Sequence, residues 1–467
     1  MASSPAGAPP RDYDIAIFGA SGFTGAHVAV ALARILAAPG GHPALPASPA
    51  PLRVALAGRS GARLREVQER ALAAAPALPR ERLAILLADV GDAASLAAMA
   101  RSSRLLLNCV GPFRLFGEPV VAACVGEGCH YLDITGEPEF MERMELRYGE
   151  EAARAGLCVV PCSAFDSIPA DLGVAFAVQQ LAERCGGAAA TSVSSYLTLR
   201  TGRAGFGGHY ATYESAVLGF ASVAELQRTR RAYALRYPHL ARVPLPGAPP
   251  RRRGAWSARG AHWVLPFPGS DASVVRRSQR ALHGARLLAG GEEGGGGAGA
   301  AAAAALPQPV HYEAFFTVAS TWSLCLSVLF GGALSLLAPW AWGRRLLLAA
   351  PGLFSGGIFS HAGPTAAQLA ETSFEMEFVA RGSGAGEEAR CVVRGPEPGY
   401  VATPALLLGA ALTLLEVRGE GGGGGAFGAC PGGVLTPASA FRGTALLQRL
   451  RALGVSFDAL PAGGQKI

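Results

Sequence analysis

The stretch Tyr13–Gly25, YDIAIFGASGFTG, constrains the fold more than any other part of the chain. Its apolar run Ile15–Phe18 is too short for a helix and is typical of a buried parallel strand. Glycines follow at a regular spacing, and Ala26–Leu36 is expected to form an apolar helix. Strand, glycine turn and helix, in that order, are the context in which a glycine motif binds a dinucleotide. A tight turn that binds nothing is the alternative, and the flanking pattern favours the dinucleotide.

Each glycine of this loop has a separate physical task. Gly19 lets the chain turn off the strand, Gly22 lets the backbone approach a pyrophosphate, and Gly25 lets the helix lie close to the sheet. The helix N-terminus adds free N–H groups and a positive dipole end. The spacing is G-x-x-G-x-x-G, as in extended dehydrogenases, rather than G-x-G-x-x-G. The residues expected to bind the cofactor here are Gly19, Ala20, Ser21, Gly22, Phe23, Thr24 and Gly25.

Arg59 predicts which dinucleotide binds. An NAD enzyme is expected to carry an acidic residue about 20 residues beyond the glycines, where it binds the ribose 2′-OH. Arg59 lies 34 residues after Gly25, or 19 once the 15-residue proline- and glycine-rich loop Ala37–Pro51 is left out. The planar guanidinium suits a 2′-phosphate. The sequence therefore favours NADP(H) over NAD(H), and an exposed arginine that opens the next helix is the alternative.

Strand and helix patterns alternate from Leu52–Ala57, the second expected strand, to residue 161. Such alternation predicts an α/β fold with a doubly wound parallel sheet and right-handed crossovers. Ligands bind at the carboxyl ends of such strands. The expected strands are Leu83–Ala88, Arg104–Val110, His130–Ile134 and Leu157–Pro161, and the expected helices are Ala62–Ala75, Ala93–Ala100, Gly117–Val125 and Glu139–Ala155. The cofactor side should then include Asp89, Asn108, Val110, Gly111, Pro112 and Asp133.

Several motifs together carry a family resemblance over nearly the whole chain. They are GASGFTG, AGRS at Ala57–Ser60, NCVGPFRLFGEPV at Asn108–Val120, YLDITGE at Tyr131–Glu137, FDSIPADLG at Phe165–Gly173, PGYVATP at Pro398–Pro404 and GGVLTPA at Gly432–Ala438. The chain resembles the saccharopine dehydrogenase-like oxidoreductases. The resemblance implies an N-terminal Rossmann domain and a second α+β domain. The family also includes proteins that look like trans-acting enoyl reductases of lipid synthesis.

Four segments follow from these patterns. The N-terminal tail 1–12 is small and Pro-rich and lacks the apolar core of a signal peptide, so no signal peptide is expected. The remaining segments are the NADP-binding Rossmann domain 13–175, an α+β domain 176–400 with a low-complexity insert 288–306, and helices and loops 401–467 that complete the fold.

The apolar segment 314–360 points to a lipid surface. Ala314–Gly343 contains no Asp, Glu, Lys or Arg over 30 residues, more than the roughly 20 residues that span a bilayer. Trp322, Trp340 and Trp342 are candidate interfacial anchors. Two apolar arms separated by Pro339 could form a hairpin that enters one leaflet, on the cytoplasmic face of a lipid droplet or membrane. A pair of buried core helices or a homodimer interface is the alternative.

Composition excludes other classes of partner. The net charge of +7 is spread over 467 residues without a concentrated basic face, so no nucleic acid is expected. Nine cysteines occur without a C-x-x-C pair or His/Cys metal spacing, which indicates a reducing compartment and no metal site.

The catalytic residues are harder to identify. Asp133 at a strand end and Asp166 in the FDSIP motif are the candidate proton donors, although Asp166 is better explained as a cap for the helix near Pro169. The leading hypothesis is an NADP-dependent oxidoreductase acting on a small-molecule or lipid-linked substrate. A saccharopine-type C–N dehydrogenase would need clustered arginines, for which Arg200 and Arg203 are the obvious pair. A catalytically inactive lipid-surface scaffold is the non-enzyme alternative.

Overall fold

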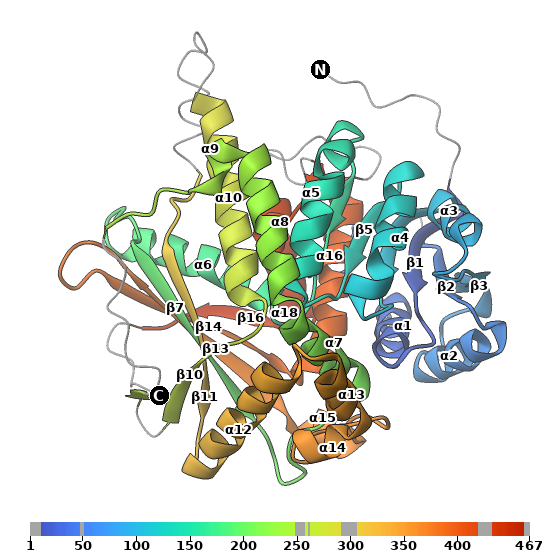
Figure 1. Ribbon diagram of the computed structural model, residues 1–467. Helices are drawn as coiled ribbons and strands as arrows, with labels where there is room; N and C mark the ends of the chain where they lie inside the picture. Colours follow the sequence, from blue (N-terminus) through green and yellow to red (C-terminus); the bar gives the residue numbers. More distant parts are fainter. Residues whose placement is uncertain are drawn as a thin grey trace.

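The computed structural model describes residues 11–46, 51–247, 257–259, 262–290, 306–418 and 432–461. In this part of the chain two seven-stranded sheets lie side by side, with a further two-stranded sheet (Figure 1). The first sheet is parallel and covered by helices, and the second is mixed. The predicted fold class, a doubly wound Rossmann sheet followed by a second α+β unit, is therefore confirmed.

The first sheet has the order β15-β6-β5-β4-β1-β2-β3. From β1 the chain runs outward to β2 and β3, and then returns to the other side of β1 as β4. This reversal places the topological switch point, where such sheets bind ligands, between β1 and β4. The strands are β1 Tyr13–Phe18, β2 Val54–Gly58, β3 Leu83–Leu87, β4 Ser103–Asn108, β5 His130–Asp133, β6 Cys158–Val160 and β15 Gly433–Val434.

The helices around this sheet follow the predicted order, and two of them, α1 and α4, begin three and four residues earlier than expected. The helix α4 begins at Phe113, four residues before the predicted start. Its first N–H groups, on Phe113 and Arg114, donate to the buried carboxylate of Glu137 at 2.9 and 3.0 Å. The cap comes from outside the helix, so no local pattern marks it. The helices are α1 Phe23–Leu36, α2 Gly61–Ala74, α3 Ala93–Ser102, α4 Phe113–Gly126 and α5 Pro138–Arg154, with a short 3₁₀ turn at Arg80–Arg82.

The second sheet has the order β16-β14-β13-β7-β11-β10-β9. The pair β7 and β11 is parallel, and its other pairs are antiparallel. The helix α6, Ile168–Arg184, packs closely on it, because a Cβ on Gly173 would overlap the ring of Phe378. The strands are β7 Ser192–Arg200, β9 Ser257–Arg259, β10 His262–Pro266, β11 His311–Val318, β13 Ser373–Arg381, β14 Glu388–Pro396 and β16 Ser456–Ala459. The two-stranded sheet joins β8 Gly208–His209 to β12 Phe359–Ser360.

The C-terminal segment contributes to both large sheets. We expected only helices and loops after residue 400, but β15 joins the first sheet and β16 joins the second. The apolar helix α16, Thr403–Val417, continues from a π-helical turn at Pro398–Ala402, and α17 Pro437–Phe441 and α18 Leu446–Ala452 follow it. Among the described residues, the stretch Pro398–Val417 is the one helix long and apolar enough to cross a membrane, and it is 83% buried inside the protein.

The apolar segment forms helices at one end of the second sheet, at the bottom of Figure 1. The expected first arm was placed too early, because Ala314–Val318 belongs to β11. The apolar helix is α12, Thr321–Leu337. Leu334 of α12, Ala338 just after it and Leu347 of α13 form one buried cluster with Tyr213 and Val217 of α7. The helices at this end of the sheet are α12, α13 Ala341–Ala349 and α14 Pro351–Phe354 of the apolar segment, together with α7 Tyr210–Ala221 and α15 Ala366–Glu371.

Some predicted segments lie wholly or mostly outside the described residues. These are most of the N-terminal tail and most of the insert 288–306; the glycine-rich run 419–425 also lies outside the described residues. Within the predicted tail, Arg11 is described, and it donates to the backbone oxygens of Ala100 and Ser103 at 2.7 and 3.0 Å.

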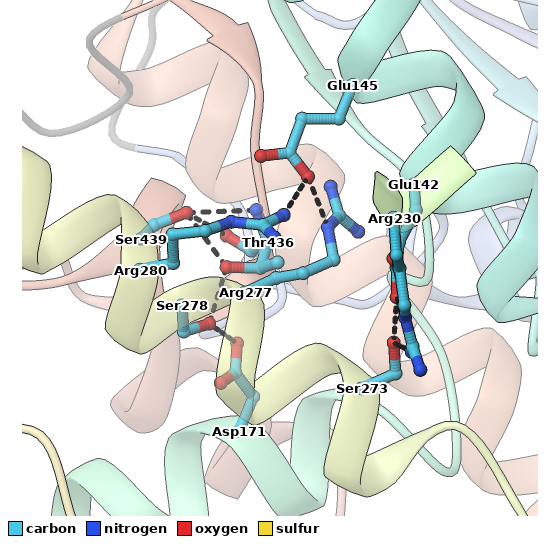
Figure 2. A network of polar contacts seen from close by, with 10 residues as sticks. All are labelled: Glu142, Glu145, Asp171, Arg230, Ser273, Arg277, Ser278, Arg280, Thr436 and Ser439. Atoms are coloured by element: carbon cyan, nitrogen blue, oxygen red, sulfur yellow. Dashed lines mark hydrogen bonds and ion pairs between the residues drawn. The ribbon is translucent and has the colours of Figure 1, made fainter. Parts of the chain in front are cut away.

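Partly buried ion pairs join the two halves (Figure 2). Glu142 on α5 accepts from Arg230 of α8, Val223–Arg236, at 2.7 Å. Glu145 on α5 accepts from Arg277 and Arg280 of α10, Asp271–Gly290, at 2.7 and 2.9 Å. The Arg277 side chain is only 3% exposed. Because an unpaired buried charge is strongly unfavourable, these pairs fix α8 and α10 against the Rossmann half.

Candidate functional site

The glycine loop has the geometry that a bound pyrophosphate needs. Gly19 has a φ of +79°, which favours glycine. A Cβ on Gly25 would overlap the carbonyl oxygen of Gly19, so only glycine lets α1 lie this close to β1. At Gly22 a Cβ would lie 3.1 Å from the same oxygen. The first turn of α1 holds no acidic residue, and no side chain caps it. Its N–H groups therefore remain available to an anion, and the loop fits a dinucleotide.

The loop lies between the carboxyl ends of β2 and β4. A Cβ on Gly19 would come 2.7 Å from the Cγ2 atom of Val110, just past β4. On the other side, the Ser21 hydroxyl oxygen lies 3.7 Å from the position of a Cβ on Gly58, the last residue of β2. Arg59 follows directly, is exposed, and makes no hydrogen bond or ion pair with the described residues. Its side chain is thus free to bind a ligand, and its assignment to the 2′-phosphate stays a prediction.

The remaining predicted cofactor residues stabilise turns at the same edge. The carboxylate of Asp89 accepts from the Gly91 N–H at 2.9 Å. The side-chain oxygen of Asn108 accepts from the Val110 N–H at 3.0 Å, and its amide donates to the Tyr131 hydroxyl at 3.0 Å. Gly111 and Pro112 lead into α4, with Pro112 as its N-cap residue. Whether these residues contact a cofactor stays a prediction.

Asp133 is a fully buried carboxyl at the end of β5. Its Oδ2 atom accepts from the Tyr131 hydroxyl at 2.8 Å. Its Oδ1 atom accepts from the N–H groups of Thr135 and Cys162, both at 2.9 Å. Burial raises the pKa of Asp133 to about 7, against these hydrogen bonds, which lower it. Both oxygens are occupied by protein groups, so Asp133 holds the loops after β5 and β6 together rather than presenting a free proton donor.

The second half of the chain covers the glycine loop with residues that sequence reasoning missed. The His209 ring stacks on Phe23 with centroids 4.6 Å apart, and Tyr400 meets Phe23 edge-on at 4.8 Å. The Tyr400 hydroxyl accepts a hydrogen bond from the backbone N–H of His209 at 2.7 Å, which holds the two residues together. A Cβ on Gly363 would lie 2.6 Å from the Phe23 ring. No local pattern links these positions to the glycine loop, because each is separated from Phe23 by more than 180 residues.

Asp166 does not cap the following helix, so that expectation was wrong. The N-cap of α6 is Ser167, and no side chain makes a capping hydrogen bond there. Asp166 instead has a φ of +74°, an unusual value for a residue with a side chain. Burial raises the pKa of Asp166 to about 6. The side chain therefore has an environment that fits a proton donor better than a helix cap.

The arginine pair expected of a carboxylate-binding site is not assembled as a clamp. Arg200 pairs with Glu375 at 3.6 Å, and its side chain is 58% exposed. Glu375 also accepts from Arg394 at 3.0 Å. Arg203 is exposed in the loop that follows β7.

Comparisons with known proteins agree with this geometry. Residues 15–160 match the family described as "Saccharopine dehydrogenase NADP binding domain". The mouse "Saccharopine dehydrogenase-like oxidoreductase" is 37% identical over 96% of this chain and 98% of its own. The Caenorhabditis elegans "Lipid droplet localized protein" is 31% identical over 96% of this chain and 98% of its own. A Mycobacterium tuberculosis protein, whose name suggests a trans-acting enoyl reductase, is 32% identical over 97% of this chain and 98% of its own.

Asp133 gives a test of the site's electrostatics. Its pKa is raised on folding, so its stabilising contribution is complete below about pH 4 and is lost as the pH rises towards about 7. Asp133→Asn keeps the shape but does not ionise. The melting temperature of the variant should fall less than that of the wild type between pH 5 and pH 8, measured by calorimetry. Curves of melting temperature against pH that run parallel for the two proteins would show that Asp133 does not titrate in this range.

Proposed function

The chain belongs to the saccharopine dehydrogenase-like oxidoreductases, and from that premise we propose that it transfers a hydride between NADP(H) and an apolar, lipid-linked substrate at the surface of a lipid droplet or membrane.

The observation that carries this proposal is the exposed apolar surface of α12, α13 and α14. On α12, Trp322, Leu329 and Leu336 are spaced by seven residues and are 72, 71 and 73% exposed. They therefore form one stripe along the helix. The surface continues through Trp340, Trp342, Leu346 and Leu353, which are 59, 61, 46 and 78% exposed. Large exposed apolar patches mark interaction sites, and tryptophans favour the interface between water and lipid.

The same helices are connected to the cofactor edge. After α14 the chain enters β12, which pairs with β8. The last residue of β8 is His209, which stacks on Phe23 of the glycine loop. The helix α7 begins at the next residue and packs against α12 and α13. A lipid surface at α12 would thus lie next to the elements that cover the dinucleotide, so an acyl-like substrate could reach the site without crossing water.

The glycine loop, the N-terminus of α1 and Arg59 are the residues that would hold NADP(H). The reduced nicotinamide supplies the hydride, while the protein binds and orients the reactants. The names of the worm and mycobacterial relatives, which refer to lipid droplets and to an enoyl reductase, support a lipid-linked substrate. The alternative amino-acid C–N dehydrogenase has less support, because Arg200 already pairs with Glu375.

Arg59→Ala tests the choice of cofactor. We expect weaker binding of NADPH, by about tenfold or more, because a charge-assisted pair with the 2′-phosphate is lost. The affinity for NADH should change little, because NADH lacks that phosphate. Calorimetric titration with both cofactors measures the difference. Equal weakening of the two would contradict the assignment.

The apolar surface can be tested on artificial lipid droplets. Leu329→Glu combined with Leu336→Glu places two charges on the stripe of α12, and the protein should then remain in the aqueous fraction after flotation. Leu235→Glu is the matched control, because Leu235 is 85% exposed on α8, away from this surface, and its replacement should leave binding intact. Wild-type protein that stays in solution in the presence of droplets would refute lipid docking.

Hydride transfer itself can be followed without knowing the substrate. The protein is incubated with extracted cellular lipids in droplets and with NADPH that carries deuterium at nicotinamide C4. Two incubations are made, one for each face of the nicotinamide ring. High-resolution mass spectrometry should find a lipid species that gains one deuterium only when the wild-type protein is present. Gly22→Val, whose side chain would intrude where the pyrophosphate approaches, should abolish the gain. Binding of NADPH and of droplets without any labelled lipid would favour the inactive scaffold.

A further inference from the structure

Two carboxyl groups lie close to each other where the loop after β6 reaches the N-terminus of α10. Asp271, the first residue of α10, is 1% exposed, and its Oδ1 atom has no hydrogen-bond partner among the described residues. Asp166 approaches Asp271 from the loop. Its Oδ2 atom lies 3.1 Å from the position that a Cβ atom would take on Gly269, two residues before Asp271. The neighbouring hydroxyls of Ser167 and Ser270 are 3.1 Å apart, which holds the two segments in contact. The sequence offered no sign of this pair, because Asp271 belongs to no recognisable motif.

The backbone of this loop is unusual. Among the described residues, the non-glycine residues with positive φ are Cys162 at +62° and Asp166 at +74°, both between β6 and α6. Such conformations are unfavourable for residues with a side chain, and they persist where the surroundings enforce them, often at functional sites. The loop starts at the cofactor edge, because the Cys162 and Ser163 N–H groups donate to Asp133 at 2.9 and 2.8 Å.

The surroundings of the pair are apolar and offer no counter-charge. Aromatic rings flank it: Phe165 packs edge-on against Phe374 with centroids 4.8 Å apart, and the Phe267 ring would overlap a Cβ on Gly269. No Lys, Arg or His of the described chain pairs with either carboxyl. The nearby titratable and charged groups are Asp171 on α6, Tyr312 on β11, Cys162 in the loop, and Arg277, which Glu145 already binds.

These surroundings favour a neutral carboxyl. Burial raises the pKa of Asp166 to about 6, and burial together with the charge of Asp166 raises the pKa of Asp271 well above its ordinary value. Two nearby carboxylates with no positive partner cannot both ionise easily in a buried site, so one of them keeps a proton.

We propose that Asp166 and Asp271 share one proton at neutral pH, and that Asp166 donates it to the substrate during reduction. Asp271 acts as a positioning residue, because it keeps the shared proton on the pair. The donor role rests on the proposed function, whereas the shared proton does not.

The reaction balances with this single proton. Reduction of a polarised double bond requires a hydride, which the reduced nicotinamide cofactor supplies, and one proton. The hydride with its electron pair forms the new C–H bond at one end of the double bond. The π electron pair moves to the other end, which takes the proton as the carboxyl O–H bond of Asp166 breaks. The doubly ionised pair then regains a proton from solvent.

The shared proton can be measured with dicyclohexylcarbodiimide, an apolar reagent that modifies protonated carboxyl groups. Peptide mass spectrometry should locate the adduct on Asp166 or Asp271 at pH 7. In the variants Asp271→Asn and Asp166→Asn, the remaining carboxyl should lose its label at a pH at least one unit lower than in the wild type. This shift corresponds to about tenfold less adduct at pH 7 for each pKa unit. Asp458→Asn, on the half-exposed Asp458 of β16, is the control and should label as the wild type does.

Two results would overturn the shared proton. One is the absence of an adduct on either residue of the wild type at pH 7. The other is an unchanged labelling midpoint in both single variants, which would show that each carboxyl is protonated by burial alone. Circular dichroism and NADPH affinity, which should match the wild type, establish that the variants are folded.

Deuterium transfer tests whether Asp166 is the proton donor. In Asp166→Asn, transfer from deuterated NADPH to the lipid should fall at least tenfold at pH 7 while NADPH affinity is unchanged. Undiminished transfer in this variant would remove Asp166 as the donor and leave the proposed oxidoreductase function in place. If the wild type transfers no deuterium, the proposed function and the donor role both fail, and the labelling still decides whether the proton is shared.

Discussion

The burial of α16 holds the two sheets in their relative positions. This helix is apolar on all sides, and a helix of that kind must be enclosed by protein. It packs against α1, β4 and β5 of the first sheet, and against α18, which in turn packs against β16 of the second. Arg449 of α18 donates to the Thr413 hydroxyl and to the Ala44 carbonyl, both at 2.6 Å. The strands β15 and β16 follow α16 in the sequence and join one sheet each. The C-terminal segment therefore ties both sheets together, and it fixes the place where they meet around the cofactor edge.

Periodic segments could be read from the sequence, and elements defined by distant contacts could not. The strands predicted at Leu83–Ala88 and His130–Ile134 are found at Leu83–Leu87 and His130–Asp133, since a short apolar run is a local signal. The strand β15 has only two residues, and it exists because it pairs with β6, about 275 positions earlier. The early start of α4 depends on Glu137 in the same way. In each case tertiary contacts supply what the local sequence lacks.

The residues of the candidate site fall into the same two groups, those marked by local sequence and those defined by distant contacts. The strand, glycine turn and helix of the loop were predicted from sequence, because such a turn requires glycine at fixed spacing and its shape depends on neighbouring residues. The residues that approach from the second half could not be predicted. His209 and Asp271 lie outside the recognised motifs, and the motif that contains Tyr400 gives no sign that its ring meets Phe23. Asp166 was noticed for its motif but assigned to a cap. Only the positive φ and the neighbouring Asp271 distinguish it from the many aspartates that precede helices.

The apolar character of the second half links substrate choice to proton chemistry. A site that accepts an acyl chain must exclude water and present rings such as Phe165 and Phe267. The same exclusion removes the solvation that a carboxylate needs, so an acidic group placed there keeps its proton at neutral pH. A polar amino-acid substrate would bring its own charges and water, and would favour ionised carboxyls paired with arginines. The unpaired carboxyls next to Phe165 and Phe267 and the exposed stripe on α12 therefore support the apolar substrate that we propose by separate physical arguments.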